Sequence, residues 1–241
     1  MAEHFFGYGR WDALYWFIGP EAAMDNDGID SVPARFESWQ RLGGAAVVDC
    51  AEHHRGFGMP KWHRHHPPTQ ATWRQLIRLL LAYKGMNPNL DDIRAYQRDH
   101  WGREGGETCV IELSGIPAPN MRVPRDRLSF LSRRVDRIRQ EARNHHPQFI
   151  LMYGTGQREE WKNIAGGEFD AHGFRWMDGT LAAIVPHPVS RGVGSEYWKG
   201  LGQRLWAVRQ ERHRPLTSAS ILGSPMRELK GTLPNLISAR P

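Results

Sequence analysis

Two acidic side chains, a histidine and an arginine lie within or shortly after short apolar stretches of the sequence. Glu21 follows the stretch 15–18, Glu112 stands within the stretch 110–113, and His187 and Arg191 follow the stretch 181–185. A carboxylate and a histidine that face each other across a cleft could cleave a bond through a cationic sugar transition state. The carboxylate would stabilise the cation or orient water, and the histidine would stabilise negative charge on the leaving group. The alternative is that Glu21 and His187 are surface loop residues without a chemical role.

The apolar stretches alternate with amphipathic patterns, which predicts strands separated by helices. We expect strands at 15–18, 110–113, 149–153 and 181–185, and a further strand at 45–48. Helices are expected from Thr72 to Gly85, along the apolar face from Leu128 to Ala142, and from Ser195 onward. This order predicts a three-layer α/β/α fold with a mainly parallel four-stranded sheet. One domain would span residues 1–214, and the tail 215–241 would be loosely packed or form an arm.

The loops after the predicted strands carry the candidate chemistry. In a parallel sheet, the loops that follow the carboxyl ends of the strands meet at one edge and form the site. Three such loops are expected, at 19–23, 112–120 and 187–191. They would bring Glu21, Glu112, His187 and Arg191 to the same edge.

Composition and charge narrow the class of partner. The chain has 241 residues and a formal net charge of +6, which favours a polyanionic partner. Ten tryptophans are available for the core and for stacking on bases. The mean hydropathy of -0.59 and the absence of a long apolar run argue against a membrane segment. The first residues lack the basic and apolar regions of a signal peptide, so we expect a cytoplasmic protein.

The cysteine count excludes two kinds of site. Only Cys50 and Cys109 occur, so neither a disulfide framework nor a four-cysteine iron–sulfur cluster is expected. The histidines of the segment 63–66, with His53 and His54 nearby, are interpreted as a loop that faces solvent or phosphate rather than as metal ligands. A metal-dependent hydrolase built on this segment is an alternative. The expected function needs no cofactor and no metal.

Two of the loops resemble the motifs of the uracil-DNA glycosylase superfamily. The segment Gly19-Pro20-Glu21-Ala22-Ala23 is similar to the first motif of that family, Gly-x-(Asp/Asn/Glu)-Pro. The segment His187-Pro188-Val189-Ser190 is similar to its second motif, His-Pro-Ser. The resemblance covers roughly residues 10 to 212. It departs from the family pattern at Ala22, where proline is missing, and at Val189, which displaces the serine by one position.

The resemblance implies a DNA glycosylase, which flips a base out of DNA and hydrolyses its glycosidic bond. It assigns the catalytic histidine to His187 and the carboxylate to Glu21; a shifted alignment would choose Asp25 or Asp27 instead. The expected base-binding residues are Gly19, Pro20, Ala23, Phe36 and Glu112. The expected DNA contacts are Gly154, Thr155, Ser190, Ser195 and Arg191, of which Arg191 would fill the gap left in the base stack.

Two departures from the uracil-specific pattern bear on which base the enzyme would excise. Ala23 stands where the uracil-specific branch has a tyrosine that excludes the thymine methyl, so it leaves room at carbon 5. Glu112 stands where an asparagine often reads the base, and a carboxylate prefers the amino group of cytosine. Together they predict a cytosine with a bulky carbon-5 substituent, as in some phage DNA, and a role in host defence. A repair enzyme for uracil or damaged bases and a non-catalytic DNA-binding module are the alternatives.

Overall fold

The computed structural model describes residues 1, 3–23, 31–118 and 125–213. The predicted tail 215–241 lies outside the described residues. The described part forms an α/β fold, as expected, around one mixed sheet. Among the described residues, no helix has the length and apolar character needed to cross a membrane.

The sheet has seven strands in the order β3-β1-β4-β2-β5-β7-β6. The four central strands, β4, β2, β5 and β7, are parallel to one another. The prediction of a four-stranded sheet was therefore wrong in its strand count, because β1 and β6 add antiparallel strands on the two sides and β3 pairs with β1 at one edge. The strands span β1 (Gly7–Tyr8), β2 (Tyr15–Ala23), β3 (Val47–Val48), β4 (Thr108–Ala118), β5 (Phe149–Tyr153), β6 (Phe174–Met177) and β7 (Thr180–Val185).

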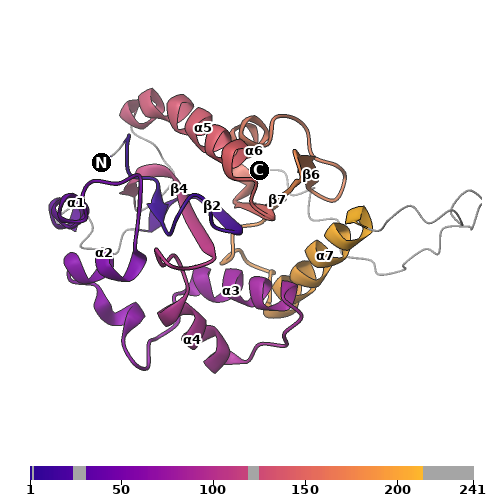
Figure 1. The fold of residues 1–241 in the computed structure, drawn as a ribbon, viewed down its shortest axis with the longest axis horizontal. Helices are drawn as coiled ribbons and strands as arrows, with labels where there is room; N and C mark the ends of the chain where they lie inside the picture. Colours follow the sequence, from indigo (N-terminus) through magenta and orange to yellow (C-terminus); the bar gives the residue numbers. More distant parts are fainter. Residues whose placement is uncertain (2, 24–30, 119–124, 214–241) are drawn as a thin grey trace, which may run out of the picture.

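Helices cover both faces of the sheet (Figure 1). They span α1 (Ser31–Arg41), α2 (Cys50–Gly56), α3 (Ala71–Tyr83), α4 (Leu90–Asp99), α5 (Arg125–His145), α6 (Arg158–Ala165) and α7 (Ser195–His213). Two short 3-10 helices, η1 (Pro60–His63) and η2 (Thr155–Gln157), lie in the connections. The helices predicted from Thr72 and from Ser195 correspond to α3 and α7, whereas α1, α2, α4 and α6 were not predicted.

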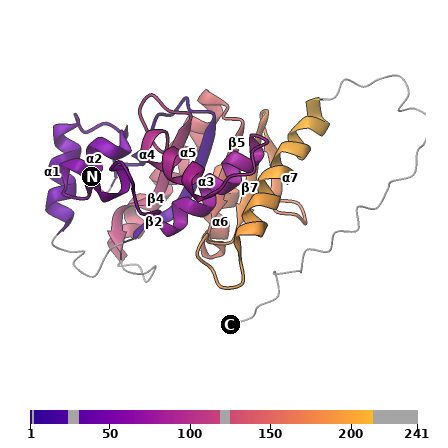
Figure 2. The same ribbon diagram turned by 90° about the horizontal axis from the view of Figure 1, so that it is seen from below.

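Each face of the sheet has its own core. Side chains of β2, β5 and β7 pack with α3 and α7 on one face, where α3 and α7 lie side by side (Figures 1 and 2). The alternate side chains of the same strands pack with α5 and α6 on the other face. This arrangement follows from the nearly continuous apolar runs, because a strand buried on both faces needs apolar residues at every position.

Strands β2 and β4 continue beyond the points where loops were expected. They pair from Tyr15↔Thr108 to Ala23↔Ala118, with an irregularity between Glu21 and Ala23. Proline is tolerated within β2 because the pairing with β5 ends before it, at Ile18↔Met152. The segments 19–23 and 112–118 are therefore strand rather than loop. The first candidate motif, residues 19–23, therefore lies on β2 beyond its last residue that pairs with β5.

Helix α5 is rich in arginine, and one of these side chains, Arg134, is buried rather than solvated. Its side chain is 2% exposed. Its guanidinium donates hydrogen bonds to the backbone oxygens of Leu113 (2.7 Å), Glu112 (2.7 Å) and Phe5 (2.8 Å). Burial lowers the pKa of Arg134 to about 10, and the nearby charges of Glu112 and Glu3 oppose this shift. Arg134 therefore fastens the N-terminal segment to β4 beside the candidate site.

Candidate functional site

The candidate site lies at the carboxyl edge of the parallel strands, where β5 ends beside β2. In chain order the parallel strands are β2, β4, β5 and β7, and their spatial order places β4 and β5 on either side of β2. The chain thus reverses direction across the sheet between β2 and β5. Open α/β sheets bind ligands in the crevice outside the strand ends at such a switch point. The residues there are Gly19 and Pro20 on β2 and Tyr153 and Gly154 at the end of β5.

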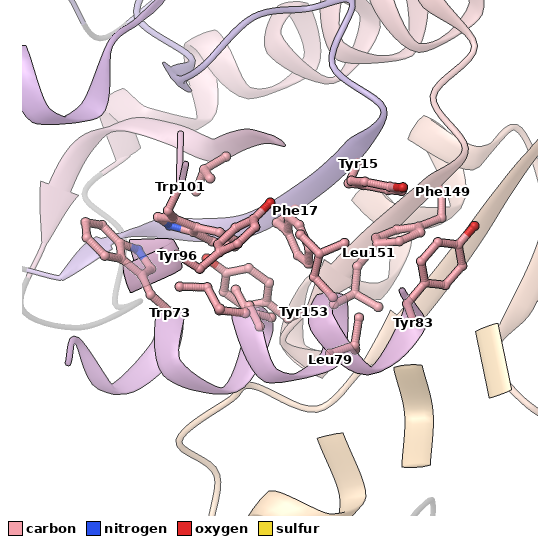
Figure 3. Close-up of a cluster of buried hydrophobic side chains, with 14 of the residues drawn as sticks. Tyr15, Phe17, Trp73, Leu79, Tyr83, Tyr96, Trp101, Phe149, Leu151 and Tyr153 are labelled. Atoms are coloured by element: carbon pink, nitrogen blue, oxygen red, sulfur yellow. The ribbon is translucent and has the colours of Figure 1, made fainter. Parts of the chain in front are cut away.

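The Tyr153 side chain lies across Gly19. A Cβ at position 19 would be 2.1 Å from the Tyr153 hydroxyl oxygen and 2.2 Å from Cζ. Figure 3 shows the Tyr153 ring within the apolar cluster between the strands and α3. Gly19 is thus required by the close approach of a side chain, and its contact with a base stays a prediction. Sequence reasoning missed Tyr153; its position directly before Gly154, at a strand end, was the available signal.

His187 lies next to Tyr153, in the connection after β7. The two rings meet edge to face, with centroids 5.5 Å apart at 70°. Burial lowers the pKa of His187, so the imidazole is neutral near pH 7. The backbone N–H of Val189 donates a long hydrogen bond of 3.4 Å to Nδ1 of His187. An accepting Nδ1 requires the proton to be on Nε2, which makes Nε2 a donor for a leaving group.

Glu112 lies on β4 directly beside Gly19, its pairing partner on β2. Its side chain is 9% exposed. Burial first, and then the charge of Glu112, raise the pKa of Tyr153, and the same two causes raise the pKa of Tyr8. The carboxylate therefore lies near both phenols, on the α3 face of the sheet. Glu112 was expected at the end of a strand. That expectation was wrong, because β4 continues to Ala118.

For Glu21, the carboxylate assigned to catalysis, the backbone pairing defines its position in the sheet. Glu21 pairs with Ser114 on β4, two residues further along both strands than the pair formed by Gly19 and Glu112. The backbone of Glu21 therefore lies at the same edge of the sheet as His187. Ala23 pairs with Ala118 at the end of the extension. Asp25 and Asp27 lie outside the described residues.

The turn after β5 offers fewer free backbone donors than expected. Gly154 adopts φ 96°, which favours glycine. Its N–H donates to the oxygen of Val185 (3.0 Å), and its own oxygen accepts from Nε1 of Trp161 (2.7 Å). The backbone N–H and C=O of Gly154 are thus engaged within the protein, whereas Thr155 and Gly156 are exposed at the start of η2.

The remaining predicted DNA contacts surround this edge. Ser190 and Arg191 are exposed between β7 and α7, and Ser195 is exposed at the first position of α7. The N–H of Ser190 donates to the oxygen of His187 at 2.9 Å, which makes this connection a tight turn. A cavity of about 370 Å³ beside β7 and α7 is lined by residues that include Thr155, Arg158 and Arg204.

The structure does not place Phe36 near His187. It lies on α1, 38% exposed, with its ring 5.8 Å from the ring of Trp39. Helix α1 packs against α2 on the side of β3 and β1, and Figures 1 and 2 place it at the opposite end of the molecule from α7. The expected contact of Phe36 with a base therefore draws no support from its position.

The histidines of the predicted loop separate into two groups. His65 and His66 are exposed, as expected. His63, by contrast, is partly buried in η1, and its Nε2 lies 2.9 Å from Nδ1 of His54 on α2. Burial lowers the pKa of His63 to about 4 and lowers the pKa of His54 well below its ordinary value. The interpretation of the whole segment as a solvated loop was wrong for His63.

Searches against protein-family models and against curated protein sequences find no match for this chain.

Proposed function

We propose that this chain is a DNA glycosylase of the uracil-DNA glycosylase type, which extrudes a base from DNA and hydrolyses its glycosidic bond. The proposal is carried by one observation: the neutral His187 imidazole lies beside Tyr153 at the same sheet edge as the backbone of Glu21. The order of the two motifs along the chain and the basic net charge of +6 also support it.

In the proposed reaction, Glu21 stabilises positive charge that develops on the sugar as the glycosidic bond breaks. Nε2–H of His187 donates to the leaving base, which departs with the bonding electron pair and is stabilised as an anion. Water then adds to the sugar carbon and loses a proton, leaving an abasic site and a free base. A neutral histidine serves here because its donor is fixed before the reaction and needs no proton uptake.

The buried carboxylate of Glu112 supports cytosine as the parent base. Cytosine presents an amino donor at N4, whereas uracil presents a carbonyl that would oppose an ionised carboxylate. Leaving two acceptors opposed costs about 1–3 kcal/mol. We therefore propose a cytosine with a bulky carbon-5 substituent as the substrate, with the substituent itself contributing to binding, and host defence against phage as the setting.

The catalytic part of the proposal is tested by separating rate from binding. His187→Ala should lower the rate of abasic-site formation, read by alkaline cleavage, by about 10²–10³-fold. Its affinity for DNA should change much less, because phosphate contacts dominate affinity. His172→Ala, at an exposed position, is the matched control and should retain the wild-type rate. Cleavage by His187→Ala at the wild-type rate would contradict the proposal, and DNA binding without any cleavage by the wild-type protein would favour a binding module.

A further inference from the structure

Three potential metal ligands converge at α2, in a place that the proposed reaction does not use. Sγ of Cys50 lies 3.8 Å from Nδ1 of His54 and 3.8 Å from Nε2 of His63. The two nitrogens are 2.9 Å apart, so the three atoms form a compact triangle. Cys50 is fully buried and His54 is 6% exposed.

The secondary structure explains how the triangle forms. Cys50 and His54 are one helical turn apart on α2, which places both side chains on the same face of the helix. The 3-10 helix η1 returns the chain to that face and supplies His63 as its last residue. Asp49 caps α2 by accepting from the N–H groups of Ala51 and Glu52, so the position of the helix start is fixed.

The separations between the three atoms are close to those that a tetrahedral zinc ion requires. With Zn–S of about 2.3 Å and Zn–N of about 2.0–2.1 Å, tetrahedral angles place the ligand atoms about 3.4–3.6 Å from one another. The observed separations of 3.8, 3.8 and 2.9 Å lie on both sides of that range. Shifts of a few tenths of an ångström would bring all three atoms to bonding distance of one ion.

A hydrogen bond between the two imidazoles explains only part of this arrangement. It accounts for the short distance between His54 and His63, but it leaves the sulfur of Cys50 equally distant from both nitrogens. An ion at the centre of the triangle engages one lone pair from each of the three atoms. Thiolate and imidazole are also the ligand types that select zinc over hard cations such as Mg²⁺.

The surroundings hold the ligands in place. The Trp73 ring stacks on the His54 ring at 5.5 Å and 14°, and the Phe57 ring meets it edge on at 5.2 Å. Gln97 donates to the backbone oxygens of Trp62 (2.9 Å) and Pro68 (3.0 Å), which anchors the segment that contains His63. An apolar wall of this kind limits access of solvent to the site.

We propose that Cys50, His54 and His63 bind one Zn²⁺ ion, whose fourth position is taken by water or an external ligand. Binding converts the Cys50 thiol to a thiolate, and its proton passes to solvent. The ion links η1 to α2 and so stabilises the packing of α2 against β1. At that contact the ring centroids of Tyr8 and His54 are 5.4 Å apart. This site is independent of the glycosylase proposal, because its test involves neither DNA nor cleavage.

The test uses the full chain, stripped with a chelator and then titrated with Co²⁺ and Zn²⁺ alone. We expect one Co²⁺ per chain, with the intense visible bands of tetrahedral coordination and a near-ultraviolet thiolate charge-transfer band, and displacement of Co²⁺ by Zn²⁺. Zn²⁺ should also raise the melting temperature, because the ion binds only the folded site. Cys50→Ser should abolish the charge-transfer band. His63→Ala removes a direct ligand, so it should weaken binding by more than the roughly 10- to 100-fold that loss of an outer-shell partner costs.

Two control variants separate this site from other donors. Cys109→Ser changes the other cysteine, which is also fully buried, and His65→Ala changes an exposed neighbour of His63. Both should bind Co²⁺ as the wild type does. His63→Ala also keeps the test valid should Cys50→Ser fail to fold, because His63 is only partly buried. A wild-type protein without tetrahedral Co²⁺ bands, or equal binding by His63→Ala and the wild type, would overturn the proposal.

Discussion

The Tyr153 hydroxyl occupies the space that any side chain at position 19 would need, since a Cβ on Gly19 would lie 2.1 Å from this oxygen. The same ring meets His187 edge to face at 5.5 Å. A substitution of Gly19 is therefore expected to disturb His187 through the Tyr153 ring, which contacts both residues.

Gly19→Ala should displace the Tyr153 ring and cost about 1–3 kcal/mol in the free energy of unfolding, as overpacking of a core does. Excision should fall as well, because the Tyr153 ring supports His187. Thermal unfolding and abasic-site formation would be measured on the same samples. Gly105→Ala is the matched control, because this glycine is exposed and a Cβ there would meet nothing within 4 Å. Wild-type stability of Gly19→Ala would contradict the proposed role of the Gly19–Tyr153 contact in core packing.

His187 is partly buried, which predicts a dependence of stability on pH. Burial lowers its pKa in the folded protein, so between the ordinary value of 6.5 and the lower folded value the unfolded chain binds more protons. The stability that a neutral His187 contributes is present above pH about 6.5 and is lost as the pH falls through the folded pKa. His187→Gln lacks this titration. Denaturant unfolding at pH 7.5 and at pH 5.5 should show the wild type losing stability relative to His187→Gln at the lower pH; a difference that moves the other way would contradict the burial of the ring.

Arg191 predicts a difference between single-stranded and double-stranded substrates. It is exposed in the connection after His187, where the proposed function places a group that enters the duplex. Arg191→Ala should slow excision from duplex DNA more than excision from single strands, because only the duplex needs its stack refilled. Arg10→Ala, in an exposed ion pair with Asp12 before β2, is the control and should change neither rate. Equal slowing on both substrates would indicate a phosphate contact instead.

Arg134 and Arg133 form a matched pair of neighbours with opposite surroundings. Arg134 is buried and donates to several backbone oxygens, whereas the Arg133 side chain is 61% exposed and pairs with Glu3 at 2.9 Å. Hydrogen bonds from a charged group contribute about 1.5–3 kcal/mol each, and exposed ion pairs about 0–1 kcal/mol. Arg134→Met should therefore lower the free energy of unfolding by at least about 3 kcal/mol, and Arg133→Met by no more than about 1 kcal/mol. Equal losses in urea unfolding would show that the buried arginine is not a structural anchor.

The sequence predicted the four parallel strands because their apolar runs end in Gly and Pro signals, as at Tyr153-Gly154 and Val185-Pro186. It did not predict β1 or β6, since strands of two to four residues carry too little pattern to stand out. Tyr153 and Arg134 were missed for a related reason. A side chain at a strand end or on a charged helix face shows its burial only through partners that are distant in sequence, such as Gly19 and Phe5.

The histidines near α2 illustrate the same limit. The sequence places His63 next to exposed residues, and nothing in its immediate neighbourhood indicates that η1 turns it toward Cys50 and His54. The four-residue spacing of Cys50 and His54 was present in the sequence, but that spacing on a helix is common. The third ligand comes from the tertiary structure alone.

Release of free base from duplex oligonucleotides tests the central claim most directly. Each oligonucleotide would carry one uracil, cytosine, hydroxymethylcytosine or glucosylated hydroxymethylcytosine, and the released base would be identified by mass spectrometry. We predict strong release of the glucosylated base, little release of uracil and none of cytosine. Glu112→Gln should lower that release by about 5- to 150-fold, the equivalent of about 1–3 kcal/mol, whereas Glu52→Gln, at an exposed position, should not. Strong release of uracil with none of the modified cytosines would contradict the account and restore a repair function.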